Sequence, residues 1–364
     1  MQILQLVSEK SWRGGEQQVA YLIEELQKAG VTSHVACRRN TPFEQYCIQQ
    51  NIPHIALGFR NEFDLQTAFK IKQYCRQQNI SLVHVHSGHS HAISVWANLL
   101  GNKIPIVLSR RVDNPVKSNR LSHYKYNYPG IARVLCVSDK IKEVVSRSLD
   151  NPQICTTVYS GIDLDRFSGC ENSRKLHQEF NLPEAQILIG NISAISPHKD
   201  YYTFVDTAEQ VVQKLPNVTF FIIGDGPERP AIEAYIAQKN LRQHILLTGF
   251  RKDIPELMCE LDVLLVTSET EGLGTTILDA FAAQTPVVAT AAGGIPELVQ
   301  DGVTGMLAPI KSPGKIAAKI VELIQNPVLR NNIVTGASQK VLKYSKKATA
   351  LHTLAIYKEI LAAS

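Results

Sequence analysis

The chain has 364 residues, a formal net charge of +5 and a sequence pI of about 8.7. This length is too great for a single hydrophobic core and predicts two domains of ordinary size. The composition, with 44% hydrophobic and 20% charged residues and no low-complexity tract, is typical of a globular protein. The mild positive charge permits an anionic substrate or an anionic membrane surface and does not demand nucleic acid.

The seven cysteines are scattered and form no CxxC pair, which favours reduced structural thiols in a cytoplasmic protein. The N-terminus lacks a basic segment followed by a long apolar stretch, so we expect no signal peptide. No run approaches the roughly 20 apolar residues of a spanning helix. The expected location is cytoplasmic, with peripheral contact at the inner face of a membrane left open.

Strands and helices alternate along the first half of the chain. Val19, Leu22, Ile23 and Leu26 recur at helical spacing, and Gly30 ends that helix. Strands are expected at 3–7, 33–37, 81–86, 104–108 and 133–137, and further helices at 64–78 and about 91–100. This alternation is typical of an open parallel sheet covered by helices. We assign residues 1–167 to this N-terminal domain.

A second series follows the polar, turn-rich residues 168–184, which we interpret as a linker. Its strands are expected at 187–192, 219–223, 245–247, 261–267 and 286–290, and its helices at 202–214, 228–239, 314–325 and about 347–362. We assign 185–345 to a C-terminal domain and 346–364 to a helix that packs back on the first domain. Two such domains in tandem predict a deep cleft at the carboxyl ends of their strands, where open α/β sheets bind ligands.

The most informative stretch begins at Glu271, between a buried strand and a helix. The Gly-rich loop 272–276 presents backbone N–H groups at a helix N-terminus, which is an anion site. A carboxylate beside such a site suits sugar hydroxyls better than phosphate, and Asp279 adds a second acid. Phosphate and hydroxyls together predict a sugar nucleotide. The alternative is a loop carboxylate that caps the helix.

An ordered series of motifs accompanies this loop. It comprises Gly14-Gly15, Ser160–Asp163, Gly224–Glu228, Thr248–Phe250, Glu271–Asp279, Gly293–Glu297 and Asp301–Gly305. The series resembles the retaining GT-B glycosyltransferases of family 4, across the whole chain and most densely from 186 to 310. The resemblance implies two Rossmann-like domains, the first binding the acceptor and the second a nucleoside-diphosphate sugar, with no metal or other cofactor.

The resemblance also implies roles for individual residues. Glu271 would hold hydroxyls of the donor sugar, and Lys199 would neutralise the donor phosphates and so assist departure of the nucleoside diphosphate. The remaining donor-binding candidates are Gly14, Gly15, Phe250, Gly272, Leu273, Gly274, Thr275, Thr276 and Asp279. Two departures stand out: Asp279 replaces the family's Glu at the ribose position, and Ser193-Ala194 lacks the family's arginine. Arg110, Arg111 and Arg251 are the candidates to replace that arginine.

First-domain contacts are less defined by the sequence. His86 is a catalytic candidate that would orient the acceptor or the sugar, and a hydrogen-bonded histidine at a strand end is the alternative. The histidines at 84–91 predict no metal site, because no acid or Cys ligand lies near them in sequence. The basic stretch 110–126, with Arg110 and Arg111 as acceptor-side candidates, predicts contact with a phosphorylated glycan or an anionic membrane. A nucleic-acid site and a solvated loop are the alternatives.

These expectations combine into one predicted function. It is retaining transfer of a sugar to a glycan or lipid-linked acceptor, in envelope polysaccharide or lipopolysaccharide biosynthesis. No first-domain residue is placed as a covalent nucleophile, so we expect same-face substitution. The alternatives are a nucleotide-sugar epimerase, a phosphorylase and a non-catalytic protein that binds sugar nucleotides.

Overall fold

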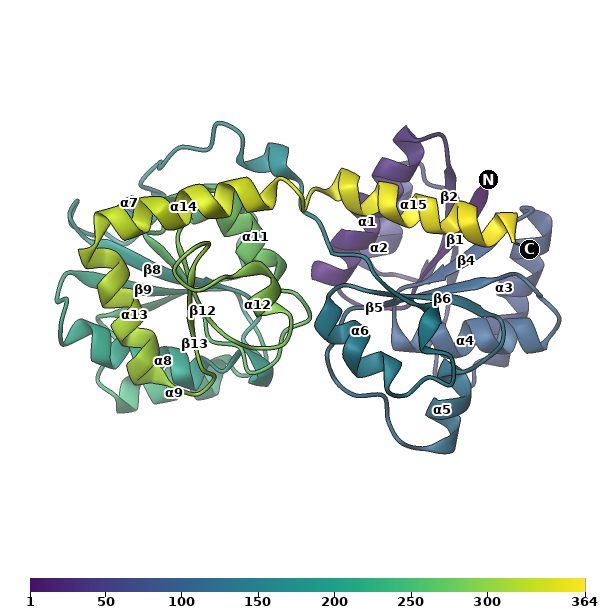
Figure 1. Cartoon of the computed structure of the whole chain (residues 1–364), viewed down its shortest axis with the longest axis horizontal. Coiled ribbons are helices and arrows are strands. Elements are labelled where there is room, and N and C mark those ends of the chain that lie inside the picture. Colours follow the sequence, from purple (N-terminus) through teal and green to yellow (C-terminus); the bar gives the residue numbers. More distant parts are fainter. Residues whose placement is uncertain (364) are drawn as a thin grey trace. The chain divides into compact units, whose positions relative to one another are not determined.

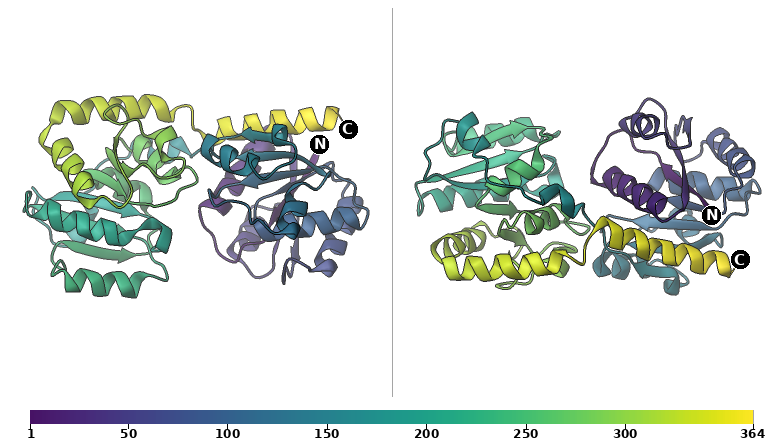
Figure 2. Two further views of the ribbon diagram at one scale, coloured as in Figure 1. Left: turned by 60° about the horizontal axis from the view of Figure 1, so that its bottom comes forward. Right: turned by 90° about the horizontal axis from the view of Figure 1, so that it is seen from above.

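A computed structural model describes residues 1–363, and the chain forms two compact units (Figure 1). Unit 1 holds residues 1–161 together with the segment that begins at Lys346, and unit 2 holds Ile162–Ser345. Each unit is built on one parallel β-sheet covered by helices, as the further views in Figure 2 show.

Unit 1 contains a seven-stranded sheet in the order β3-β2-β1-β4-β5-β6-β7. The strands are β1 (Gln2–Val7), β2 (Thr32–Arg38), β3 (His54–Leu57), β4 (Leu82–Val85), β5 (Ile106–Arg110), β6 (Ile131–Cys136) and β7 (Cys155–Thr157). The helices are α1 (Gly14–Lys28), α2 (Pro42–Gln49), α3 (Leu65–Gln77), α4 (Gly88–Leu99), α5 (Arg120–Tyr126), α6 (Asp139–Ser146) and α15 (Lys346–Ala362). The strand order reverses between β1 and β4, which is where such sheets place ligands.

The C-terminal helix α15 belongs to the core of unit 1. Its Leu354, Tyr357 and Ile360 are buried in one cluster with Ile3 of β1 and Leu26 of α1. Figure 1 shows α15 running beside α1. Burial of this apolar stripe stabilises the return of the chain to the first sheet.

Unit 2 contains a six-stranded sheet in the order β10-β9-β8-β11-β12-β13. The strands are β8 (Ile187–Ile192), β9 (Val218–Ile223), β10 (Ile245–Gly249), β11 (Val263–Val266), β12 (Val287–Thr290) and β13 (Met306–Ala308). The helices are α7 (Lys175–Glu179), α8 (Tyr201–Val212), α9 (Arg229–Gln238), α10 (Ile254–Glu260), α11 (Thr275–Ala282), α12 (Ile295–Leu298), α13 (Pro313–Gln325) and α14 (Pro327–Val341). Here the order reverses between β8 and β11.

Several elements have no clear signal in the sequence. The expectations above omit α2, β3, α5, α6, β7, α7, α10, α12, β13 and α14. In α14 the apolar residues do not form one stripe, and Gly336 is required by packing, because a Cβ there would lie 2.4 Å from the Val303 carbonyl oxygen. Residues 168–184, interpreted above as a linker, lie in unit 2, where Glu260 accepts hydrogen bonds from the Leu176 and His177 N–H groups.

Candidate functional site

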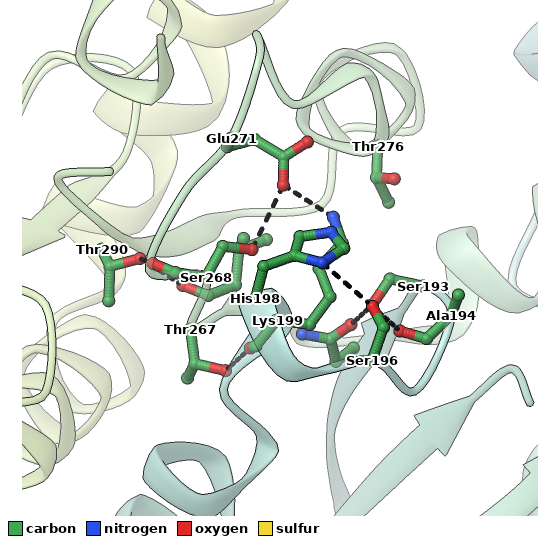
Figure 3. A network of polar contacts seen from close by, with 12 residues as sticks. Ser193, Ala194, Ser196, His198, Lys199, Thr267, Ser268, Glu271, Thr276 and Thr290 are labelled. Atoms are coloured by element: carbon green, nitrogen blue, oxygen red, sulfur yellow. Dashed lines mark hydrogen bonds and ion pairs between the residues drawn. The ribbon is translucent and has the colours of Figure 1, made fainter. Parts of the chain in front are cut away.

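A pocket in unit 2 lies where β8 and β11 end, at the reversal of strand order. Its lining residues are Asn191, Ile192, Ser193, Lys199, Val266, Ser268, Glu271, Gly274, Thr276 and Ile277. They come from β8, β11, the loops that follow these strands, and the first turn of α11, and Figure 3 shows their polar contacts. The structure therefore brings Lys199, Glu271, Gly274 and Thr276 of the predicted donor set into one pocket.

The backbone of Lys199 is fixed from two sides. Lys199 ends a short 3-10 helix, and Asp200 follows in the left-handed region at φ +47°. The Asp200 carboxylate accepts a hydrogen bond from the Thr203 N–H at 3.1 Å and so caps α8. The Thr267 hydroxyl, from the loop after β11, donates to the Lys199 carbonyl at 3.0 Å. These contacts aim the Lys199 side chain toward Glu271 (Figure 3).

The glycine turn after β9 packs against the loop that leads to Lys199. A Cβ on Gly224 would lie 2.1 Å from the Ser193 carbonyl oxygen, and one on Gly226 would lie 2.2 Å from that of Ile195. The Ile195 N–H donates to the Asp225 carbonyl at 3.1 Å. Both glycines are therefore needed for close backbone approach, and they set the course of the segment before Lys199.

The loop of Glu271 is held by backbone contacts. The Gly294 N–H donates to the Glu271 carbonyl at 2.9 Å, which gives the Gly293–Glu297 motif a structural role. Gly274 adopts φ +89° at the N-terminus of α11, a conformation that favours glycine. The Leu273 side chain is buried, so only the backbone of this residue is available to a ligand.

Lys199 and Glu271 form an ion pair with 2.6 Å between Nζ and Oε2, and each side chain is only 17% exposed. The Ser268 hydroxyl also donates to Oε2, at 3.2 Å (Figure 3). A cation, a carboxylate and the N-terminus of α11 thus share one pocket. This combination can hold an anionic group and a polyhydroxylated group side by side.

Asp279 lies within α11 and is partly buried. Burial raises the pKa of Asp279 to about 7, and the charge of Arg166 opposes this rise. Arg166 lies on the 3-10 helix Leu164–Phe167, which contacts α11. Arg166 is not among the residues predicted from the sequence, because nothing in its spacing from Asp279 indicates that the two are neighbours.

Four other residues considered for donor binding do not line the unit 2 pocket: Phe250, Arg251, Gly272 and Thr275. Phe250 follows β10 and is 73% exposed. The guanidinium of Arg251 is paired with Glu179 at 2.7 Å and Asp253 at 2.7 Å, so this arginine serves a structural network. Thr275 and Gly272 flank Gly274 in the sequence, and both are partly exposed.

In unit 1, His86 directly follows β4 with both ring nitrogens engaged. Nδ1 contacts Arg111 Nη2 at 3.3 Å, and Nε2 contacts Gln5 Oε1 at 2.7 Å. Burial lowers the pKa of His86 well below its usual value, and His84 and Arg111 add to the effect. The ring is therefore neutral, accepts from Arg111 and donates to Gln5.

The structure separates the two acceptor-side arginines. Arg110 donates from Nη1 to the Tyr126 hydroxyl at 3.0 Å and from Nη2 to the Asn114 carbonyl. Arg111 instead lies beside the start of α1, since a Cβ on Gly15 would be 3.9 Å from its Cδ. Burial lowers the pKa of Arg111 to about 10, and within residues 1–363 its Nε has no hydrogen-bond partner. Gly14 and Gly15 therefore lie near Arg111, in unit 1.

Across residues 1–363, no group of three or more His, Cys, Asp or Glu side chains is arranged to hold a metal ion. In the same part of the chain, none of the helices has the length and apolar content to span a bilayer.

Comparisons with known proteins identify the family and the fold. Residues 172–340 match the family described as glycosyl transferases group 1, and residues 12–166 match glycosyltransferase family 4. The chain is 25% identical over 289 residues to N-acetyl-alpha-D-glucosaminyl L-malate synthase of Bacillus anthracis, covering 77% of this chain and 74% of that protein. It is 23% identical over 328 residues to the UDP-Gal:alpha-D-GlcNAc-diphosphoundecaprenol alpha-1,3-galactosyltransferase of Escherichia coli. This match covers 83% of this chain and 84% of that protein. The crystal structure of Anabaena HepE with UDP and glucose superposes with a TM-score of 0.84 at 21% identity, over 100% of both chains.

Proposed function

Because the chain belongs to the group 1 glycosyltransferases and has the GT-B fold, we propose that it transfers a sugar from a nucleoside diphosphate to a glycan or lipid-linked acceptor, with retention of configuration. The observation that carries the proposal is the Lys199–Glu271 pair in the unit 2 pocket, beside the N-terminus of α11. That pocket offers a cation and backbone N–H groups for a diphosphate and a carboxylate for sugar hydroxyls.

Each donor group has a proposed partner in unit 2. The diphosphate lies against Lys199 and the N–H groups at 274–276, and Glu271 accepts hydrogen bonds from the sugar hydroxyls. Asp279 accepts from the ribose. As the bond between the sugar and the diphosphate breaks, negative charge grows on the departing oxygen, and Lys199 stabilises that charge. UDP is the first nucleotide to test, because HepE was solved with UDP and the E. coli relative is named for UDP-Gal.

Retention requires the acceptor oxygen to enter on the face that the diphosphate leaves. Among the residues that line the unit 2 pocket, Glu271 is the one carboxylate, and it is paired with Lys199. This supports same-face substitution over a covalent enzyme intermediate. The acceptor oxygen bonds to the anomeric carbon as the bond to phosphate breaks, and the acceptor proton passes to the departing phosphate oxygen.

Unit 1 supplies the proposed acceptor contacts. Arg111 beside Gly15 offers a desolvated guanidinium, and neutral His86 orients it through the Nδ1 contact. Such a group suits an anionic acceptor. The two relatives are named for L-malate and for a diphosphoundecaprenol, and both of these are anionic. Metal independence, a cytoplasmic location and a role in envelope polysaccharide or lipopolysaccharide synthesis complete the proposal.

The proposal is tested by incubating the purified protein with UDP-, GDP- and ADP-sugars in the presence of EDTA. We expect slow hydrolysis of at least one donor, and transfer when a phosphorylated or lipid-linked acceptor is added. The Glu271→Gln variant should lose both activities, whereas Glu269→Gln, which breaks the exposed pair with Lys311, should retain them. Neither binding nor turnover of any donor in the panel would contradict the proposal. Conversion of donor alone into a C2 epimer would identify an epimerase instead.

A further inference from the structure

An exposed apolar face covers two neighbouring helices of unit 1. Phe63, Leu65 and Phe69 contribute from the start and first half of α3, and Leu99 and Leu100 from the end of α4; we call this the α3–α4 face. Phe63 is 61% exposed, and the other four side chains are between 39% and 50% exposed. The residues of α3 that are buried in the core lie on a different side of the helix and are Ala68, Ile71 and Cys75. Leu65 and Phe69, one turn apart on α3, are thus apolar side chains that the core of unit 1 does not bury.

The face is continuous. The ring of Phe63 lies 6.3 Å from that of Trp96, which is one turn before Leu99 and Leu100 on α4. From α3, Lys72 donates through Nζ to the Leu100 carbonyl at 2.7 Å. Figure 1 shows α3 and α4 next to each other, with α5 beyond α4. On α5, Leu121 and Tyr124 are also exposed, at 67% and 51%.

The segment of the chain that carries this face is basic. Residues 65–138 contain ten Lys and Arg residues and a single acid, Asp113, although the whole chain has a net charge of only +5. The rest of the chain therefore carries a formal net charge of −4. Lys70, Arg76 and Lys103 are exposed on α3 and in the loop after α4.

Two acids, Glu62 and Asp64, lie just before α3 and offset only part of the positive charge of residues 65–138. Glu62 approaches Lys125 at 3.6 Å, and the Asp64 carboxylate accepts from the Arg60 and Thr67 N–H groups. Both acids are therefore engaged by neighbours in unit 1. The apolar face consequently has a basic rim.

We propose that the α3–α4 face docks unit 1 on an anionic lipid bilayer. Aromatic and leucine side chains would enter the boundary between headgroups and acyl chains, and the basic rim would contact anionic headgroups. Exposed apolar patches of this kind mark interaction sites, and the positive rim selects a negatively charged partner. The proposal deepens the acceptor half of the proposed function, because a lipid-linked acceptor lies in such a bilayer.

The test is co-flotation of the purified full chain with phosphatidylcholine vesicles, with and without phosphatidylglycerol. We expect binding to the anionic vesicles only. Phe63→Ser with Phe69→Ser should reduce the bound fraction about tenfold. Replacing Lys70, Arg76 and Lys103 by Gln should weaken binding about fivefold for each charge at low salt. The matched control is Val328→Ser with Leu342→Ser, which removes two exposed apolar side chains from unit 2 and should bind as the unaltered chain does.

A second readout locates the bound face. The chain has two tryptophans, so a Trp12→Phe variant leaves Trp96 as the single reporter. Lipids brominated in the acyl chains should quench Trp96 emission on anionic vesicles. Equal binding to neutral and anionic vesicles, or full binding by the Phe63/Phe69 variant, would overturn the proposal. So would a dimer in solution that this variant dissociates, without vesicle binding. The assay contains neither donor nor acceptor, so its outcome is independent of the transfer test.

Discussion

Replacing Glu271 by Gln should tighten the binding of free UDP while it abolishes sugar transfer. The reason is the ion pair of 2.6 Å between Glu271 and Lys199, which occupies the lysine that we propose binds the diphosphate. Gln keeps the shape of the side chain and can still accept from the Ser268 hydroxyl, so the loop should stay in place. Without the carboxylate, Lys199 is released and a negative charge that repels the diphosphate is gone.

The size of the effect follows from burial. Each side chain is 17% exposed, so the pair is stronger than a surface ion pair and is not fully desolvated. A net pair energy of about 1 kcal/mol is reasonable for that setting. If the variant no longer spends this energy on the ion pair, UDP binding gains it, and the Kd for UDP falls about fivefold. The gain should shrink as ionic strength rises, because the freed charge is partly accessible to salt.

Isothermal titration calorimetry with UDP measures this directly. Lys199→Gln should weaken binding, and Glu269→Gln, on the same loop, should leave it unchanged. Circular dichroism spectra should be identical for all variants. If Glu271→Gln binds UDP no more tightly than the unaltered chain, Glu271 does not withhold Lys199 from the diphosphate, and the proposed competition is wrong.

Three further outcomes are expected. The pKa of Asp279, raised by burial from 3.8 to about 7, means that the folded chain binds a proton that the unfolded chain releases. Stability should therefore fall as pH rises from about 4 to 7, and Asp279→Asn should flatten that fall and be about 1–2 kcal/mol more stable at pH 8, as thermal melts between pH 4 and 8 would show. Gly224→Ala should cost about 2–4 kcal/mol in urea unfolding, because its Cβ would meet the Ser193 carbonyl oxygen at 2.1 Å, whereas Gly88→Ala, with nothing within 4 Å, should cost less than about 1 kcal/mol. Arg111→Gln should raise the KM for an anionic acceptor at least about tenfold and leave the Kd for UDP unchanged, and a shift in UDP binding would refute its placement on the acceptor side.

Some site features follow from local sequence, and others do not. The Gly-rich loop after β11 is readable because glycine, a preceding apolar strand and a following helix are all close in sequence. The contact between Lys199 and Glu271 joins residues 72 positions apart, and it exists because β8 and β11 are neighbours in the sheet. The sequence offered Arg110, Arg111 and Arg251 as equals. Only packing shows that Arg251 is held by acids of its own unit.

The sequence alone determined three properties of this protein. These are the alternation of strands and helices, the two parallel sheets and the membership of a glycosyltransferase family. Hydrophobic periodicity and loop composition are local properties, so they can be recognised in the sequence without a structure. The tertiary structure decided which distant side chains meet: Arg166 with Asp279, and His86 with Arg111. It also decided that Ala68, Ile71 and Cys75 of α3 are buried while Leu65 and Phe69 stay exposed, because a helix with apolar residues on both sides gives no sign of which side the sheet will cover.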